Sequence, residues 1–321
     1  MTRITLSDID HQRPTALHRH PVAMFFGLTL GVAWALWLPL VILQDRMPPA
    51  PALLLTMLGS LVPSATALFL VARLQGRGEV QRLLRRLLMG RVGIGWYVAI
   101  LALAALPMCA VWVGILLGAP VPVVVATIPG VVSLFLFSIF PGSAMGEEIG
   151  WRGFALPRLQ AGRSALAASL ILGAVWGTYH LPLFLLGSPT RPIALFLPFA
   201  LGGVIMSIFY TWMYNGTGGS LLIAVLLHAA TNLPLTIVYA PLGERVVPVF
   251  WLFDAMLALA AVVLVARTGA ATLSRSHAKQ TVTPEPSSAR QTHQPADQAQ
   301  CHAHDHRLPT VPVPPVETVI V

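Results

Sequence analysis

Long runs of apolar residues dominate the pattern of this chain from about residue 20 to residue 267. A transmembrane helix needs about 20 consecutive, predominantly apolar residues. Windows of that length fit at 21–43, 51–72, 96–118, 122–145, 165–187, 192–214, 219–240 and 247–267. The fourth window is the weakest, because Pro122, Pro129 and Pro141 interrupt it. The pattern therefore predicts an all-α, polytopic integral membrane bundle of about eight transmembrane helices.

The continuity of these runs separates the two architectures that can span a bilayer, helices and closed β-barrels. Barrel strands give short segments of alternating hydrophobicity, whereas these runs are continuous Leu, Ala and Val. The composition agrees, since only 10% of the residues are charged and soluble domains average about 25%. We expect a protein of the plasma membrane without a signal peptide, because polar residues 1–20 come before the first run and no small-residue cleavage site closes it.

Arginines set the predicted orientation, because short loops rich in Lys and Arg stay in the cytoplasm. The segment between the second and third windows contains Arg73, Arg77, Arg82, Arg85, Arg86 and Arg91. Placing it in the cytoplasm gives an N-in, C-in topology with the loop around Arg158 on the same side. The net charge of +8 then reflects orientation and anionic lipid. We expect no nucleic-acid partner, since the arginines flank spans and are not interleaved with aromatics.

Composition divides the chain into three parts. Residues 1–20 are a predicted cytoplasmic N-terminal segment, and residues 21–267 are a transmembrane domain whose motif core is 130–235. Residues 268–321 are rich in Ser, Thr, Gln, Pro and His, which predicts a disordered cytoplasmic tail. The tail contains four residues that could bind a soft metal: Cys301, His302, His304 and His306. Such a cluster on a disordered tail is more often incidental than a site.

Residues 80–89 between the second and third windows have an amphipathic pattern. Leucines fall on one side of a helix and arginines largely on the other: Leu83, Leu84, Leu87 and Leu88 against Arg82, Arg85 and Arg86. An interfacial amphipathic helix fits this pattern. A basic loop that only fixes the topology fits it equally well.

Two adjacent acids, Glu147 and Glu148, follow the apolar run 131–140. An ionisable residue in a membrane costs about 2.5–3.5 kcal/mol on insertion scales, so it suggests a function by default. Glu148 and Arg152 are four residues apart and face each other on a helix, whereas Glu147 points about 100° away from Glu148. We expect Arg152 to hold Glu148, which leaves Glu147 to face a cavity as a general base.

Glycines recur every fourth residue around these acids, at Gly142, Gly146 and Gly150. A stripe of small residues lets another helix approach closely. Two interpretations fit the stripe equally well: it serves helix packing alone, or the close packing forms the wall of a catalytic cavity.

Two histidines lie in other apolar windows, each with a proline two or six residues further on. His180 precedes Pro182, and His228 precedes both Asn232, four residues on, and Pro234. The prolines remove backbone hydrogen bonds and can open room beside the imidazoles. With the acids, these residues supply a base for water, imidazoles for an oxyanion or a metal, and an orienting amide.

Spacing does not decide between a metal site and a metal-free site. There is no His-Glu-x-x-His helix, and Glu147, His180 and His228 would hold a divalent metal such as zinc only if they converge. Asp254, another acid in the last window, is expected to make a polar contact in the outer half of the bundle, outside the site.

The motifs around these residues resemble the CPBP family of intramembrane proteases, which includes type II CaaX prenyl endopeptidases and bacteriocin self-immunity proteins. The resemblance spans about residues 130–235 and rests on order, spacing and membrane placement. Three motifs carry it: Glu-Glu-x-x-x-Arg at Glu147, Glu148 and Arg152, Phe-x-x-x-His at Trp176 and His180, and His-x-x-x-Asn at His228 and Asn232. Trp176 departs from the family pattern, although both residues are large aromatics.

The resemblance implies a metalloendopeptidase-like enzyme in which Glu147 activates water and Arg152 anchors Glu148. It also implies that His180, His228 and Asn232 line the same cavity and stabilise the tetrahedral intermediate. The implied substrate is a peptide or a membrane protein, prenylated or not, cut near the cytoplasmic leaflet. One alternative is a non-catalytic immunity or scaffold protein that binds a partner in this cavity. A proton-coupled transporter is another, disfavoured by the lack of internal repeats and by the clustering of the acids at one membrane face.

Overall fold

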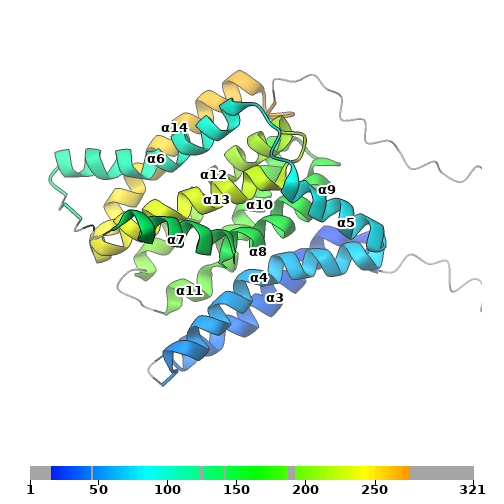
Figure 1. The fold of residues 1–321 in the computed structure, drawn as a ribbon, viewed down its shortest axis with the longest axis horizontal. Coiled ribbons are helices and arrows are strands. Elements are labelled where there is room, and N and C mark those ends of the chain that lie inside the picture. The colour runs from blue at the N-terminus through cyan, green and yellow to red at the C-terminus, as the bar shows by residue number, and fades with distance from the viewer. Residues whose placement is uncertain are drawn as a thin grey trace, which may run out of the picture. The chain divides into compact units, whose positions relative to one another are not determined.

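The computed structural model describes residues 16–44, 46–119, 121, 122, 124, 126–140, 142–186 and 192–274. This part of the chain consists of helices and connecting turns and contains no strand (Figure 1). Seven helical stretches are long and apolar enough to cross a membrane: Pro21–Ile42, Pro49–Leu74, Ile94–Leu116, Ile128–Gln160, Ala165–Leu185, Ile193–Gly216 and Leu221–Thr268. The predicted all-α membrane bundle is confirmed. Most of the predicted N-terminal segment and the tail with Cys301, His302, His304 and His306 lie outside the described residues.

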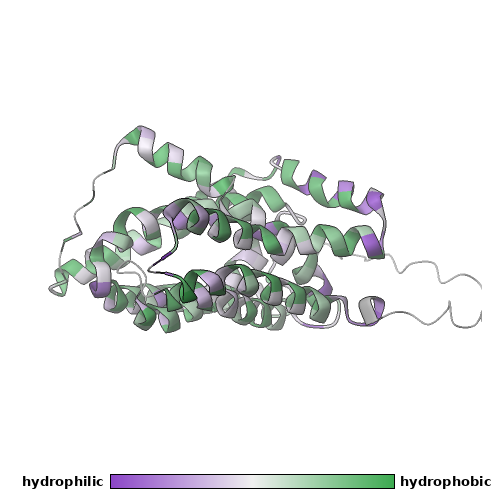
Figure 2. Cartoon of the chain, turned by 90° about the horizontal axis from the view of Figure 1, so that it is seen from below, coloured by the Kyte–Doolittle hydropathy of each residue, from purple (hydrophilic) through white to green (hydrophobic). Residues whose placement is uncertain are grey.

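The helices follow one another in the order of the apolar runs. Those of the N-terminal half are α2 (Ala16–Arg19), α3 (Pro21–Ile42), α4 (Pro49–Leu74), α5 (Arg77–Arg85), α6 (Ile94–Leu116) and α7 (Ile128–Ile139). Those that follow are α8 (Ser143–Gly150), α9 (Leu156–Gln160), α10 (Ala165–Tyr179), α11 (Leu181–Leu185), α12 (Phe196–Gly216), α13 (Leu221–Pro234) and α14 (Val246–Thr268). Large apolar side chains such as Leu101 on α6, Ile128 on α7 and Leu259 on α14 are exposed. Figure 2 shows hydrophobic residues over most of the long helices, as a bundle facing lipid requires.

The predicted seventh and eighth windows are joined, so there are seven separate stretches rather than eight. After α13, a π-helical turn (Leu235–Tyr239) and 3-10 turns (Ala240–Arg245) lead directly into α14. Gly243 alone leaves the helical conformation there, at φ 56° and ψ −134°. A residue without a Cβ adopts that conformation at little cost, so this glycine provides the bend between the two predicted spans.

The fourth predicted window, 122–145, is wrong at both ends. Helix α7 begins only at Ile128, where the Thr127 side chain accepts a hydrogen bond from the Gly130 N–H at 3.2 Å. Pro129 lies in the first turn of α7, a position where proline's missing N–H costs nothing. The backbone is extended at Phe140 and Gly142, and α8 then carries the helical stretch on towards Gln160. The acids therefore lie inside this stretch and not at its end.

The predicted glycine stripe brings α8 against α4. A Cβ on Gly146 would lie 2.5 Å from the Ser60 carbonyl oxygen, and one on Gly150 would lie 2.5 Å from that of Pro63. Gly142 has a different function, because its N–H donates to the Phe137 carbonyl oxygen at 2.7 Å in the turn between α7 and α8. Two of the three glycines thus fix the position of the acid-bearing helix against its neighbour.

The amphipathic prediction for residues 80–89 is confirmed only in part. The segment is helical, as α5 followed by a 3-10 turn (Arg86–Leu88), with Leu83 buried and Leu84 and Leu88 exposed. Arg86 turns towards the bundle instead of away from it. Its guanidinium donates to the Tyr214 hydroxyl at 2.8 Å and lies 5.2 Å from the centre of that ring.

Candidate functional site

The acids of α8 are fully buried, and one of them is paired as the spacing predicts. Arg152, in the π-helical turn Trp151–Ala155 that follows α8, donates from Nη1 to Glu148 Oε1 at 2.9 Å. Both side chains are 0% exposed. Removing one partner of such a buried pair typically costs about 3–5 kcal/mol, because the other charge is left without compensation.

Arg152 also ties α8 to α12. Its Nη2 donates to Ser207 Oγ at 3.2 Å, and its guanidinium lies 3.8 Å from the centre of the Tyr210 ring. A guanidinium stacked on an aromatic face and bonded at its fork has little freedom to move. Arg152 therefore holds the carboxylate of Glu148 in one position.

Glu148 has a second partner that sequence spacing does not reveal. His228 on α13, 4% exposed, places Nδ1 at 2.8 Å from Glu148 Oε1. A carboxylate only accepts hydrogen bonds, so Nδ1 carries the proton. The bond orients the imidazole and directs Nε2 to the hydroxyl oxygen of Ser143, 3.1 Å away. Glu148 is thus a positioning residue for His228.

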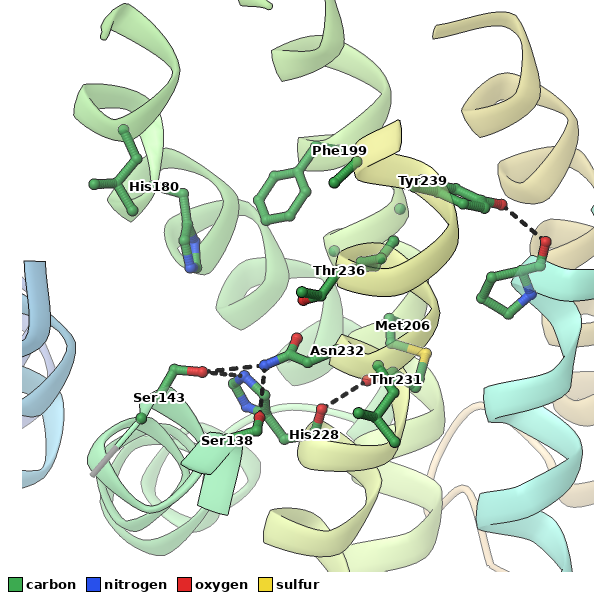
Figure 3. Close-up of a pocket in the computed structure, with 18 of the residues that line it drawn as sticks. Ser138, Ser143, His180, Phe199, Met206, His228, Thr231, Asn232, Thr236 and Tyr239 are labelled. Atoms are coloured by element: carbon green, nitrogen blue, oxygen red, sulfur yellow. Dashed lines mark hydrogen bonds between the residues drawn. The ribbon is translucent and has the colours of Figure 1, made fainter. Parts of the chain in front are cut away.

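Ser143, the first residue of α8, connects two of the predicted site residues. Asn232 donates from Nδ2 to Ser143 Oγ at 3.2 Å and to Ser138 Oγ at 3.1 Å, and Figure 3 shows these bonds beside His228. Sequence analysis did not include Ser143 in the site. The sequence signal for Ser143 is its position four residues before Glu147. That spacing does not indicate that α13 lies beside the start of α8, where His228 and Asn232 contact Ser143.

Glu147 faces a different set of side chains. The indole Nε1 of Trp176 donates to Glu147 Oε2 at 2.6 Å, and His180 Nε2 lies 3.8 Å from Glu147 Oε1. The His180 Nδ1 donates to the Trp176 carbonyl oxygen at 2.8 Å, because that oxygen can only accept. The i,i+4 spacing on α10 thus directs Nε2 of His180 towards the carboxylate.

Room for the Trp176 indole comes from α12. A Cβ on Gly203 would lie 2.9 Å from two carbon atoms of the indole ring. The family pattern has phenylalanine at this motif position, and a phenyl ring has no N–H to donate. Trp176, which replaces the phenylalanine of the family pattern, therefore donates a hydrogen bond to Glu147 that phenylalanine could not make.

The four predicted residues Glu147, His180, His228 and Asn232 line one cavity of about 480 Å³. His180 lies at the junction where α10 ends and α11 begins, with Pro182 in the first turn of α11. Pro234 ends α13 before the π-helical turn. Both predicted prolines thus interrupt regular helix beside the cavity, and apolar side chains such as Phe199, labelled in Figure 3, form its walls.

The predicted three-ligand metal site at Glu147, His180 and His228 stays a prediction. Glu147, His180 and His228 share the cavity, but the two ring nitrogens of His228 bond to Glu148 and Ser143. Within the described ranges no three His, Cys, Asp or Glu side chains are placed together as a metal centre.

Asp254 on α14 lies outside the cavity wall, as expected, but without the expected polar contact. It is 2% exposed, and neither carboxylate oxygen has a hydrogen-bond partner among the described residues. Its Oδ1 lies against Gly202 of α12, where a Cβ would come within 2.6 Å. The prediction of a polar contact there is wrong.

Comparison with known proteins agrees with the motifs. Residues 128–234 match the family model described as type II CAAX prenyl endopeptidase Rce1-like. The chain is 33% identical over 97 residues to CAAX prenyl protease 2 of Methanococcus maripaludis, an overlap of 28% of this chain and 36% of that protein. The chain thus spans about a third of the length of the relative that it matches. The resemblance that the three motifs predict is confirmed for this segment.

Proposed function

We propose that this chain, whose residues 128–234 match the model of the Rce1-like CAAX prenyl endopeptidase family, is an intramembrane endopeptidase that uses water activated by Glu147. The observation that carries the proposal is the position of Glu147. Its carboxylate lines the cavity, 1% exposed, with one oxygen bonded to Trp176 and the other 3.8 Å from His180 Nε2. The two atoms are too far apart for a direct hydrogen bond, and a water on the cavity side of them can contact both.

In the proposed reaction Glu147 takes a proton from water while the water oxygen attacks the carbonyl carbon of the scissile peptide bond. The carbonyl oxygen becomes an oxyanion beside Ser143, where Asn232 Nδ2 and His228 Nε2 converge. In this step His228 is the imidazolium, so Nε2–H donates to the oxyanion while Nδ1–H donates to Glu148. Donors fixed in advance in a water-poor site stabilise developing charge best. Glu147 then gives its proton to the leaving amine nitrogen as the C–N bond breaks.

We further propose that cleavage occurs near the cytoplasmic leaflet and that the chain is oriented N-in, C-in. Contacts gather the basic segments at one end of the bundle: Arg158 bonds to Gln75, and Ser220 bonds to the Met89 carbonyl oxygen. Ala165 bonds to the Ala271 carbonyl oxygen at the same end. This grouping supports the orientation that the arginines predict. The substrate is a peptide or a membrane protein whose segment enters the cavity, and prenylation of it is left open.

Glu147→Gln tests the proposal, because it keeps an acceptor for Trp176 and removes the base. We expect membranes that contain normal amounts of this variant to have lost proteolysis, while Glu244→Gln, which changes another acid of the chain, retains it. An immunity or scaffold protein would keep its function in Glu147→Gln. Proton flux in proteoliposomes of the purified chain without substrate would instead favour the transporter alternative.

A further inference from the structure

A second hollow lies on the far side of α12 from the acids, between α6, α12 and α14. Its volume is about 520 Å³. Leu103 of α6, Phe209 of α12 and Leu264 of α14 are among the apolar side chains that line it. None of the site residues Glu147, His180, His228 and Asn232 contributes to it. This hollow, called here the α6–α14 groove, is therefore separate from the proposed active site.

One end of the groove has a different chemistry. Trp96, Trp212 and Arg267 line it there, and the two indole rings contact each other with their centres 4.9 Å apart and their planes tilted by 54°. Gly216 has no space for a Cβ because the Trp96 ring lies against it. Within the described residues, neither indole N–H donates a hydrogen bond and Arg267 forms no ion pair. The mouth of the groove thus combines one cation and two indole rings with an apolar floor.

These three residues lie at the end of the bundle that carries the basic segments. Trp96 is in the first turn of α6, Trp212 is one turn before the end of α12, and Arg267 is in the last turn of α14. Tryptophan is enriched at the level of lipid headgroups. Basic pockets between transmembrane helices on the cytoplasmic side bind anionic headgroups.

We propose that the α6–α14 groove binds one anionic glycerophospholipid. An acyl chain lies on Leu103, Phe209 and Leu264, and the phosphate group lies at Arg267, at the end of the groove that Trp96 and Trp212 also line. No acidic residue lines the groove among the described residues. The groove therefore has no carboxylate to repel an anionic headgroup such as that of phosphatidylglycerol. Charge complementarity at the mouth, combined with the apolar floor, selects a lipid over a soluble anion.

Native mass spectrometry of the purified full chain tests this site, with dioleoyl phosphatidylglycerol and dioleoyl phosphatidylcholine added in separate titrations. We expect one phosphatidylglycerol to be retained at a concentration about tenfold lower than phosphatidylcholine. Arg267→Gln should reduce that preference at least fivefold. Arg163→Gln is the matched control, because it removes an exposed arginine outside the groove.

A second variant tests the apolar floor while the charge stays in place. Ala102, an exposed residue that lines the groove, becomes bulky in Ala102→Trp, which should reduce phosphatidylglycerol retention at least fivefold. Equal losses in Arg163→Gln and Arg267→Gln would overturn the proposal in favour of diffuse surface attraction. Undiminished retention in Ala102→Trp, or no preference between the two lipids in the wild-type chain, would also overturn it.

Discussion

At the residue scale, the contacts within one helix could be predicted and those between helices could not. The pairing of Glu148 with Arg152 follows from a spacing of four. The bond from His228 to Glu148 joins residues 80 positions apart, and the bond from Trp176 to Glu147 joins residues 29 positions apart. Sequence gives the faces of helices but not which helices touch, so spacing pairs Glu148 with Arg152 alone and does not indicate Ser143.

Trp176→Phe tests the hydrogen bond that distinguishes this chain from the family pattern. It removes the indole N–H and keeps an aromatic ring, so Glu147 Oε2 loses its partner at 2.6 Å. Hydrogen bonds to charged groups contribute about 1.5–3 kcal/mol, which corresponds to roughly a tenfold to hundredfold lower kcat in a peptide-cleavage assay. We expect KM to change little, because Trp176 acts through the base.

The matched control for this variant is Trp112→Phe, since Trp112 on α6 is 64% exposed and lies outside the cavity. It should leave kcat at the wild-type value. If kcat of Trp176→Phe equals that of the control, Trp176 is a packing residue and does not position Glu147.

At the element scale, the sequence predicts where helices lie better than where they end. The apolar runs mark every long helix, and the glycine stripe correctly predicts a close helix approach to α8. The start of α7 and the joining of α13 to α14 depend on Thr127 and Gly243, whose local geometry no hydropathy window contains. The break between α7 and α8 matters for the site, because Ser138 and Ser143 flank it and both bond to Asn232.

Gly150→Ala tests the contact between α8 and α4. Its new Cβ would lie 2.5 Å from the Pro63 carbonyl oxygen, and backbone cannot move aside as a side chain can. Overpacking typically costs about 1–3 kcal/mol, so we expect a lower unfolding temperature in detergent. Gly31→Ala on α3, where a Cβ meets nothing within 4 Å, should unfold at or above the wild-type temperature. Equal unfolding temperatures for the two variants would show that α8 is not held closely against α4.

At the scale of the whole molecule, three polar features interrupt a largely apolar bundle in the described part of the chain: the buried acids of the cavity, the buried Asp254 on α14 and the arginine-rich end. Composition and hydropathy predict the membrane class, since they reflect the sum over many residues. They do not predict the α6–α14 groove, which depends on the spacing between three helices. The orientation of the bundle rests on the arginines and on their grouping at one end, and it stays a prediction.

Single-cysteine labelling tests that orientation. The background is Cys109→Ala with Cys301→Ala. Arg77→Cys places a thiol at the start of α5, in the segment before α6, and Leu117→Cys places one just after the end of α6. For an N-in, C-in chain, a membrane-impermeant thiol reagent should label Leu117→Cys in intact cells. It should label Arg77→Cys only after the cells are permeabilised. The reverse labelling pattern would contradict the predicted orientation.

The central claim is that Glu147 activates the water that cuts a peptide bond. The most direct measurement compares newly formed protein termini in membranes from cells that contain the wild-type chain or Glu147→Gln at equal level. We predict a set of termini that is present with the wild-type chain and absent with the variant, and these termini identify the substrate. Identical sets of termini in the two membranes would contradict the claim and leave the cavity as a binding site.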